Sequence, residues 1–240
     1  SDEPLLRALQ AQTAPDERRL LAAAVFRVIT NERLGDVSYL LQDRDESIRA
    51  AAIEAMVSSR DSRLAPFLRP LLMDKNSAVR VRVLEGLMLS DPKEGMLAFT
   101  RGLNWLDGYE LISWARDHGA QMGPYVKKAL TSSRDGVRHG AIEALAELPP
   151  PTRVEVATAW VESTTSPAVR IRLLEILADA SPSQVLPLLE KAAGDENLVI
   201  RAAAVRLLGR LGKSGDIVVK ALDDKALEVQ MEAVVGLLGG

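Results

Sequence analysis

Few side chains in the sequence have the type and spacing that metal binding or catalysis needs. The chain contains two histidines, His118 and His139, and no cysteine. Neither histidine is flanked by cysteines or belongs to a His-Glu-x-x-His spacing, so no zinc site is predicted. Glycine-rich phosphate loops, Walker sequences and a Gly-x-Ser-x-Gly elbow are also missing. We therefore predict a protein that is not an enzyme and holds no metal and no cofactor.

Carboxylates recur at one position of a repeated segment, but their pattern does not fit acid-base catalysis. The four glutamates are Glu54, Glu85, Glu143 and Glu175. Helical spacing places them away from the apolar stripe of each segment, on an exposed ridge without a neighbouring nucleophile or metal ligand. Arg82 and Arg172, three residues before two of them, neutralise part of the row. A solvated face and a binding surface for a basic partner segment explain this row equally well.

Aromatic side chains gather in the middle of the chain. The stretch 99–125 holds five of the nine aromatic residues. Trp and Tyr anchor many interfaces, although bulky rings also fill the core around an irregular helix pair. We assign Trp114 to the core. Trp105 and Tyr109, near an expected turn at Asp107-Gly108, are predicted to be exposed for partner binding.

An apolar residue followed by arginine recurs along the chain and marks a repeated helix. The five pairs are Ile48-Arg49, Val79-Arg80, Val137-Arg138, Val169-Arg170 and Ile200-Arg201. The copy at Val229 has Gln230 in place of the arginine, the copy beginning at Leu20 lacks the arginine, and a degenerate copy is expected near Gly108. The copies begin at residues 20, 48, 79, 108, 137, 169, 200 and 229. Such regular spacing indicates a repeat array.

Each repeat is predicted to contain two helices. Apolar residues at helical spacing follow each start, and residues with side-chain oxygens precede it. The predicted N-caps are Asp45, Asn76, Ser166 and Asn197, and Pro167 follows one of them. The first helices are predicted from apolar segments that begin at Leu64, Tyr125, Val154, Gln184 and Asp216. Neither helix buries its stripe alone, so neighbouring pairs must stack, and almost no sheet is expected. The run Pro149-Pro150-Pro151 predicts a rigid turn between repeats.

An aspartate stands five residues before the apolar residue in several copies, as with Asp43, Asp74, Asp195 and Asp224. With the Ala-rich positions that follow, this pattern resembles the short, phycobilisome-lyase-type subtype of HEAT-like repeat. The resemblance implies an all-α fold, a right-handed α-solenoid (superhelix) of about eight helix-pair repeats in one domain over residues 1–240. The implied repeats are 1–31, 32–60, 61–91, 92–119, 120–149, 150–181, 182–212 and 213–240. It also implies that the second helices line the concave side.

The arginines of the repeated pairs are predicted to be structural, and a basic binding ladder is the alternative. We call Arg49, Arg80, Arg138, Arg170 and Arg201 the arginine series. Each lies at the edge of its buried stripe, about 80° of helix rotation from the centre. From there a guanidinium reaches loop acceptors such as Asp43, Asp74 or Asp195, in its own repeat or the adjacent one.

Composition limits the possible partners. Acidic residues outnumber basic residues by 33 to 30, so no global positive field attracts phosphate backbones and nucleic acid is disfavoured as a partner. The absence of long apolar runs predicts a soluble chain and favours the cytoplasm, although the lack of cysteine leaves the redox compartment open. The chain ends on Leu237-Leu238-Gly239-Gly240 without a polar capping unit, so we expect a fragment of a longer protein or an end-to-end contact.

Three functions are compatible with these observations. The leading hypothesis is a non-enzymatic interaction module, or scaffold, that binds a partner protein or peptide on the concave face. An alternative is an accessory subunit of a lyase-like or other enzyme complex, which the repeat subtype permits. A third is a HEAT-like DNA glycosylase, because Trp105 and Asp107 resemble the Trp and Asp residues beside that family's DNA-binding groove, although the net charge of -3 disfavours it. The predicted partner-binding residues are Glu54, Arg82, Glu85, Trp105, Tyr109, Glu143, Arg172 and Glu175.

Overall fold

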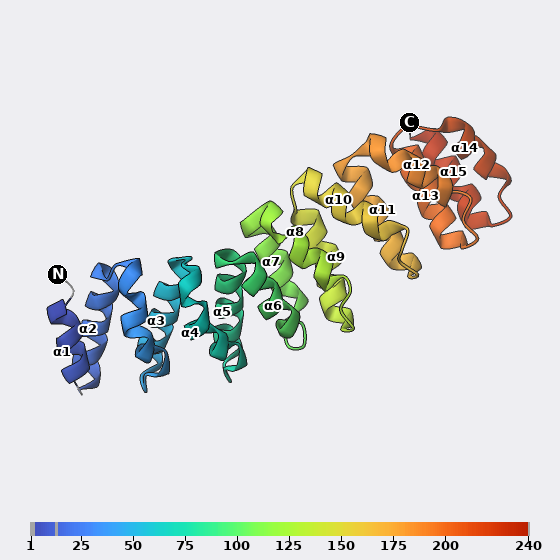
Figure 1. The fold of residues 1–240 in the computed structure, drawn as a ribbon. Coiled ribbons are helices and arrows are strands. Elements are labelled where there is room, and N and C mark those ends of the chain that lie inside the picture. The colour runs from blue at the N-terminus through green and yellow to red at the C-terminus, as the bar shows by residue number, and fades with distance from the viewer. Residues whose placement is uncertain (1–2, 13, 240) are drawn as a thin grey trace. The chain divides into compact units, whose positions relative to one another are not determined.

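The computed structural model describes residues 3–12 and 14–239, and these residues form helices and loops without any strand (Figure 1). The chain divides into two compact units, unit 1 up to Leu106 and unit 2 from Asp107. Within each unit, helix pairs are stacked in the order of the chain, as in an α-solenoid. The predicted all-α architecture is therefore confirmed.

Unit 1 alternates first and second helices. Its elements are α1 (Glu3–Ala11), α2 (Pro15–Val28), the 3-10 helix η1 (Asn31–Gln42), α3 (Glu46–Ser58), η2 (Ser62–Leu64), α4 (Ala65–Leu68), η3 (Arg69–Met73), α5 (Ser77–Ser90) and α6 (Pro92–Gly102). The second helices of its repeats are α2, α3 and α5.

Unit 2 continues the same alternation. Its elements are α7 (Gly108–His118), η4 (Gly119–Met122), α8 (Gly123–Ala129), α9 (Asp135–Glu147), α10 (Pro150–Val161), α11 (Pro167–Ala180), α12 (Pro182–Ala192), α13 (Leu198–Arg210), α14 (Gly215–Lys220), η5 (Ala221–Asp223) and α15 (Leu227–Leu238). The second helices are α7, α9, α11, α13 and α15.

The boundary between the units falls inside the predicted repeat 92–119. Helix α6 is the last helix of unit 1, and α7 is the first helix of unit 2. A single domain over residues 1–240 stays a prediction. Gly240, part of the chain end for which a longer protein or an end-to-end contact was expected, lies outside the described residues.

Side-chain oxygens begin the second helices at the predicted residues. Asp45 accepts hydrogen bonds from two N–H groups of the first turn of α3, at 2.9 and 3.4 Å. Asn76 and Asn197 each accept from the N–H two residues later at 2.9 Å. Ser166 accepts from the N–H three residues later at 3.5 Å. All four predicted N-caps are confirmed.

Prolines decide where several first helices begin and where they are interrupted. The prediction that Pro149, Pro150 and Pro151 form a turn is wrong for the last two, because α10 begins at Pro150. A proline in the first helical turn has no N–H that the helix would use. In the third repeat, Pro66 and Pro70 remove two N–H donors, and the expected single helix is split into η2, α4 and η3.

The core of each unit is aliphatic and lies between successive helices. Leu84 and Leu87 of α5 in unit 1, and Leu173 and Leu177 of α11 in unit 2, have 0 to 1% of their surface exposed. The main contacts of α11 are with α10 and α12 and with the second helices α9 and α13. Each helix pair therefore depends on its neighbours for apolar cover, as stacking repeats require.

Glycines allow the closest helix contacts in unit 2. A Cβ on Gly140 of α9 would lie 2.3 Å from backbone atoms of Gly108 in α7, and a Cβ on Gly209 of α13 would lie 2.5 Å from Gly236 of α15. Such contacts are possible only without a side chain. The expected turn at Asp107-Gly108 is consequently wrong: Asp107 precedes α7, and Gly108 is its buried first residue.

Candidate partner-binding surface

A common loop leads into the second helices. In this loop, the backbone N–H of the N-cap residue donates a hydrogen bond to the side chain of the residue two positions earlier. Asp43, Asp74 and Asp195 do so at 2.9, 2.7 and 2.9 Å. Ser132 and Asp224 occupy the same place and accept at 3.2 and 2.9 Å. This turn fixes the loop before each helix begins.

The arginine series closes the same loop from the helix side. Four of its members donate from Nη1 to the backbone carbonyl of that loop residue: Arg49 at 2.7 Å, Arg80 at 2.7 Å, Arg138 at 2.6 Å and Arg201 at 2.9 Å. In the last repeat, Gln230 makes the equivalent bond from Nε2 to the Asp224 carbonyl at 2.6 Å. The recurrent bond explains why a long side chain with an N–H donor stands at this position.

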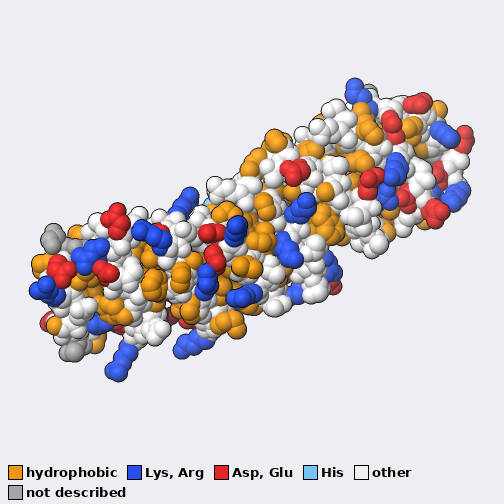
Figure 2. Space-filling model, viewed as in Figure 1, with side chains coloured by type: hydrophobic (Ala, Val, Ile, Leu, Met, Phe, Trp, Pro, Cys, Tyr) orange, Lys and Arg blue, Asp and Glu red, His pale blue; other side chains and the backbone are white. Residues whose placement is uncertain are grey.

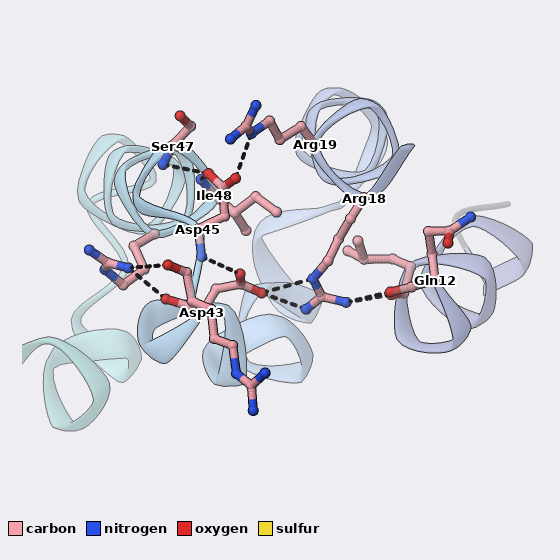
Figure 3. Close-up of polar contacts among 10 residues, drawn as sticks. Gln12, Arg18, Arg19, Asp43, Asp45, Ser47 and Ile48 are labelled. Atoms are coloured by element: carbon pink, nitrogen blue, oxygen red, sulfur yellow. Dashed lines mark hydrogen bonds and ion pairs between the residues drawn. The ribbon is translucent and has the colours of Figure 1, made fainter. Parts of the chain in front are cut away.

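The first repeat also contains this arginine, and its predicted absence is wrong. The repeated segment was expected to begin at Leu20, but in the structure it begins at Glu17. Arg18 therefore takes the place that the arginine series has in the other repeats. Arg18 Nη1 donates to the Gln12 carbonyl at 3.2 Å, as in the other loops (Figure 3). The register was missed because Glu17 stands where the other copies have Ile or Val.

Several of these arginines also join neighbouring repeats. Figure 3 shows Arg18 reaching the Asp43 carboxylate, 3.1 Å from Nε. Arg170 pairs with Asp195 at 2.6 Å, and Arg201 pairs with Asp224 at 2.9 and 3.0 Å. The Arg201 guanidinium holds the pKa of the Asp224 carboxyl below its usual value. One guanidinium thus connects its own loop to the loop of the next repeat.

Trp105 replaces the loop aspartate at the end of unit 1. Its ring lies 5.0 Å from the guanidinium carbon of Arg80, the arginine of the preceding repeat. A cation-π contact therefore stands where Arg18, Arg170 and Arg201 form an ion pair with the next repeat. This contact and the neighbouring Gly102 leave Trp105 half-buried rather than fully exposed.

The other aromatic residues of the central stretch divide between core and surface. Trp114 is 4% exposed and belongs to the core of unit 2, whereas Tyr109 is 76% exposed. Trp105 belongs to unit 1 and Tyr109 to unit 2. We therefore treat these two candidates as separate surfaces.

The glutamate row pairs with arginines of the following repeat. Arg82 donates to Glu54 at 2.8 and 2.7 Å and to Glu85 at 2.8 Å. In unit 2, Arg172 binds Glu143 at 3.1 and 2.8 Å, and Arg206 binds Glu175 at 2.8 Å: these bonds cross from one second helix to the next. The hydrogen bonds from arginine lower the pKa values of Glu54 and Glu143.

Two grooves lie between consecutive second helices, one in each unit. The first groove, of about 330 Å³, separates α3 from α5, and the second, of about 650 Å³, separates α11 from α13. Their shared lining consists of small or aliphatic residues beside the glutamate row: Ala50, Ile53, Ala78 and Val79 in the first groove, and Ala168, Ile171 and Val199 in the second. Sequence reasoning missed the grooves. The exposed alanines two residues after the N-caps, Ala78 and Ala168, are the available signal.

Metal sites and membrane spans are both absent from the part of the chain that the structure describes. Among residues 3–12 and 14–239, no cluster of His, Asp and Glu side chains could hold a metal ion. None of the helices in this part of the chain is long and apolar enough to cross a membrane.

Comparisons with known proteins agree with this architecture. The HEAT repeats family matches residues 154–237. The structure of Kap121p bound to Ste12p has a TM-score of 0.55 and 14% identity, and the match covers 99% of this chain and 32% of that chain. The structure of human deoxyhypusine hydroxylase in complex with glycerol has a TM-score of 0.42 and 16% identity, and the match covers 98% of this chain and 95% of that chain. The structure of the complex of CpcE and CpcF of phycocyanin lyase from Nostoc sp. PCC7120 has a TM-score of 0.34 and 18% identity, and the match covers 100% of this chain and 87% of that chain. No curated protein matches the chain in sequence.

The fold and the repeated loop define an α-solenoid built from helix pairs. Residues 154–237 of unit 2 match the HEAT repeats family, and unit 1 is built from helix pairs of the same kind.

Proposed function

We propose that the chain is a non-enzymatic interaction module that binds a partner polypeptide along its second helices. The observation that carries this proposal is the recurrence, in each unit, of a groove between consecutive second helices that is lined by aliphatic side chains and by an Arg and a Glu of the row. Grooves of several hundred Å³ accommodate side chains of a bound segment. Kap121p, which shares the fold, was solved bound to Ste12p and supports a protein partner.

Within this proposal the glutamate row forms the rim of the binding surface. Glu54, Arg82, Glu85, Glu143, Arg172 and Glu175 would contact the partner at the edges of the grooves. Trp105 and Tyr109 would add contacts at the ends of their units. Exposed pairs of this kind contribute more to specificity than to affinity.

Affinity capture with groove-filling variants tests the proposal. Ala78 and Ala168 are exposed and line the two grooves, so changing both to Gln narrows the grooves and leaves the core intact. We expect the proteins that wild type captures from its native cell extract to be depleted at least tenfold. Ala159→Gln, on the exposed surface of the first helix α10, is the matched control and should capture them normally. Equal capture by all three proteins would contradict the proposed surface.

A further inference from the structure

Arg49 differs from every other member of the arginine series in its charged contacts. Arg170 and Arg201 bind an aspartate of the next repeat, Arg138 binds Asp135 on its own helix, and Arg80 stacks on Trp105. Arg49 donates from Nη1 to the carbonyls of Asp43 and Arg44 at 2.7 and 3.1 Å, and no carboxylate of the described residues lies within 4.0 Å. Its positive charge is therefore not matched by an anion of the described chain.

The aspartate that should pair with Arg49 is present but stands apart. Asp74 occupies the place that Asp195 and Asp224 have in the paired repeats and accepts the Asn76 N–H at 2.7 Å as they accept theirs, but no nitrogen of Arg49 lies within 4.0 Å of its carboxylate. Arg49 and Asp74 both line the 330 Å³ groove between α3 and α5. The groove thus lies where Arg170 and Arg201 form an ion pair with the next repeat.

The free edge of Arg49 is accessible from this groove. Arg49 is half-buried, and its Nε and Nη2 atoms make no hydrogen bond within the described chain. Because neither of these atoms is buried, both are accessible to solvent. A guanidinium edge with two adjacent N–H groups matches the two oxygens of a carboxylate. Beside it the groove is lined by Ala50, Ile53 and Val79.

The charges on the rim favour an anion at Arg49. Lys75 supplies a second cation, and the first turn of α5 contributes the positive end of a helix dipole. Of the acidic residues, Glu54 is paired with Arg82, whereas Asp74 accepts the Asn76 N–H and forms no ion pair with Arg49. Glu46 remains on the rim as an exposed carboxylate, where solvent screens it.

We infer that this groove binds an acidic segment of a partner polypeptide, with Asp or Glu on the free edge of Arg49 and an adjacent aliphatic side chain over Ile53 and Val79. This inference deepens the proposed function and rests on it. Two contacts of different chemistry at a fixed separation define a short motif, an aliphatic residue next to an acidic one. A basic segment would be opposed by Arg49 and Lys75, two cations of this groove that pair with no carboxylate of the described residues.

Replacing Arg49 by Gln tests the inference without breaking the loop. Gln230 shows that a glutamine at this position keeps the bond to the loop carbonyl. The Arg49→Gln variant therefore loses the carboxylate-binding edge and keeps the structural contact. Arg138→Gln is the matched control, because Arg138 makes the same loop bond in unit 2 and lies outside the groove.

The experiment selects short random peptides displayed on phage against the intact chain, followed by fluorescence anisotropy with the labelled peptides. We expect the selected peptides to share an aliphatic-acidic pair and to bind Arg49→Gln about tenfold more weakly, while binding to Arg138→Gln changes less than twofold. Changing the acidic residue of the peptide to its amide should weaken binding to wild type and cause little further loss in Arg49→Gln.

The outcomes separate the inference from the proposed function. Peptides that bind wild type and Arg49→Gln equally would overturn the acidic-segment inference and leave the interaction module standing. A shared basic motif would overturn it in the same way. If no peptide of the library binds, and if the Gln variants at Ala78 and Ala168 capture the same proteins as wild type, both the acidic-segment inference and the proposed function are contradicted. Self-association of the chain that Arg49→Gln abolishes would assign the groove to a second copy instead.

Discussion

Each arginine at the start of a second helix makes contacts that two smaller residues could not combine. Arg201 is 5% exposed, and it binds two carbonyls of its own loop and the Asp224 carboxylate of the next loop. A planar guanidinium with five N–H donors satisfies all three acceptors at once. At the residue scale these contacts support a structural role for Arg201, which stays a prediction until stability is measured.

The variant Arg201→Ala tests this role. It leaves Asp224 and two carbonyls without their donor in a half-buried position, so we expect it to lower the free energy of unfolding of unit 2 by about 3 kcal/mol. Urea denaturation followed by circular dichroism measures the loss. Arg7→Ala is the control: Arg7 pairs with Glu3 on the exposed surface, and its removal should cost less than about 0.5 kcal/mol. Unchanged stability of Arg201→Ala would return the arginine to the list of binding candidates.

The Arg-Glu row gives the acid dependence of stability a definite sign. The hydrogen bonds from Arg172 lower the folded-state pKa of Glu143 below its value in the unfolded chain. A carboxyl group with a lowered pKa stabilises the fold fully when the pH is above its pKa in the unfolded chain, about 4.3. This stabilisation is lost as the pH falls through its pKa in the folded chain.

The variant Arg172→Gln should therefore raise the pKa of Glu143 toward 4.3, as measured by an NMR titration of its side-chain carbonyl carbon. It should also weaken the dependence of stability on pH below about 4. The pKa of Glu54, which the hydrogen bonds from Arg82 lower in unit 1, serves as the internal control and should not move. An unshifted Glu143 in wild type would show that the pair is not formed in solution.

At the element scale, the distance between second helices is set by residues without side chains. Gly108 of α7 and Gly140 of α9 bring two backbones into direct contact, and Gly209 and Gly236 do the same for α13 and α15. Between the other second helices of unit 2, Arg-Glu bonds of the row join α9 to α11 and α11 to α13. Glycine contacts and Arg-Glu bonds therefore connect different pairs of second helices.

Two alanine substitutions in α9 are expected to have opposite effects. A Cβ at Gly140 would lie 2.3 Å from the Gly108 backbone, so Gly140→Ala must push the helices apart and should destabilise unit 2 by about 2 kcal/mol. At Gly136 the Cβ meets nothing within 4 Å, so Gly136→Ala should stabilise by about 0.5 kcal/mol through the lower entropy of the unfolded chain. Thermal unfolding compares them, and a shift of the same sign in both would contradict this packing.

At the scale of the whole molecule, charge is mixed rather than segregated. On the face drawn in Figure 2, Lys and Arg side chains are interspersed with Asp and Glu side chains in each unit. The net charge of the sequence is -3. Duplex DNA binds proteins that present many unpaired cations to its phosphates, whereas most arginines of the rows are already paired.

We consequently expect no binding of a labelled DNA duplex at micromolar protein, measured by fluorescence anisotropy. The signal should stay flat between low and physiological salt, because few counterions would be released. Binding that weakens steeply with salt would instead revive the glycosylase alternative based on Trp105 and Asp107.

The sequence by itself determined the helix pairs. Their periodicity, N-caps and stacking follow from local rules, since the spacing of apolar residues and capping oxygens is set within a few residues of the chain. It also indicated the loop aspartates and the arginines that bind there. It misplaced the first repeat because one apolar position holds Glu17, and a single substitution is enough to hide a local pattern.

Only the tertiary structure decided which residues of different repeats meet. The stacking of Arg80 on Trp105, the closure of Arg201 on Asp224 and the open groove between Arg49 and Asp74 come from similar sequences. Which of these forms depends on distances of a few ångströms between neighbouring helices. Those distances are set by the packing of residues far apart in sequence, as where Gly209 of α13 meets Gly236 of α15. No local rule contains that information.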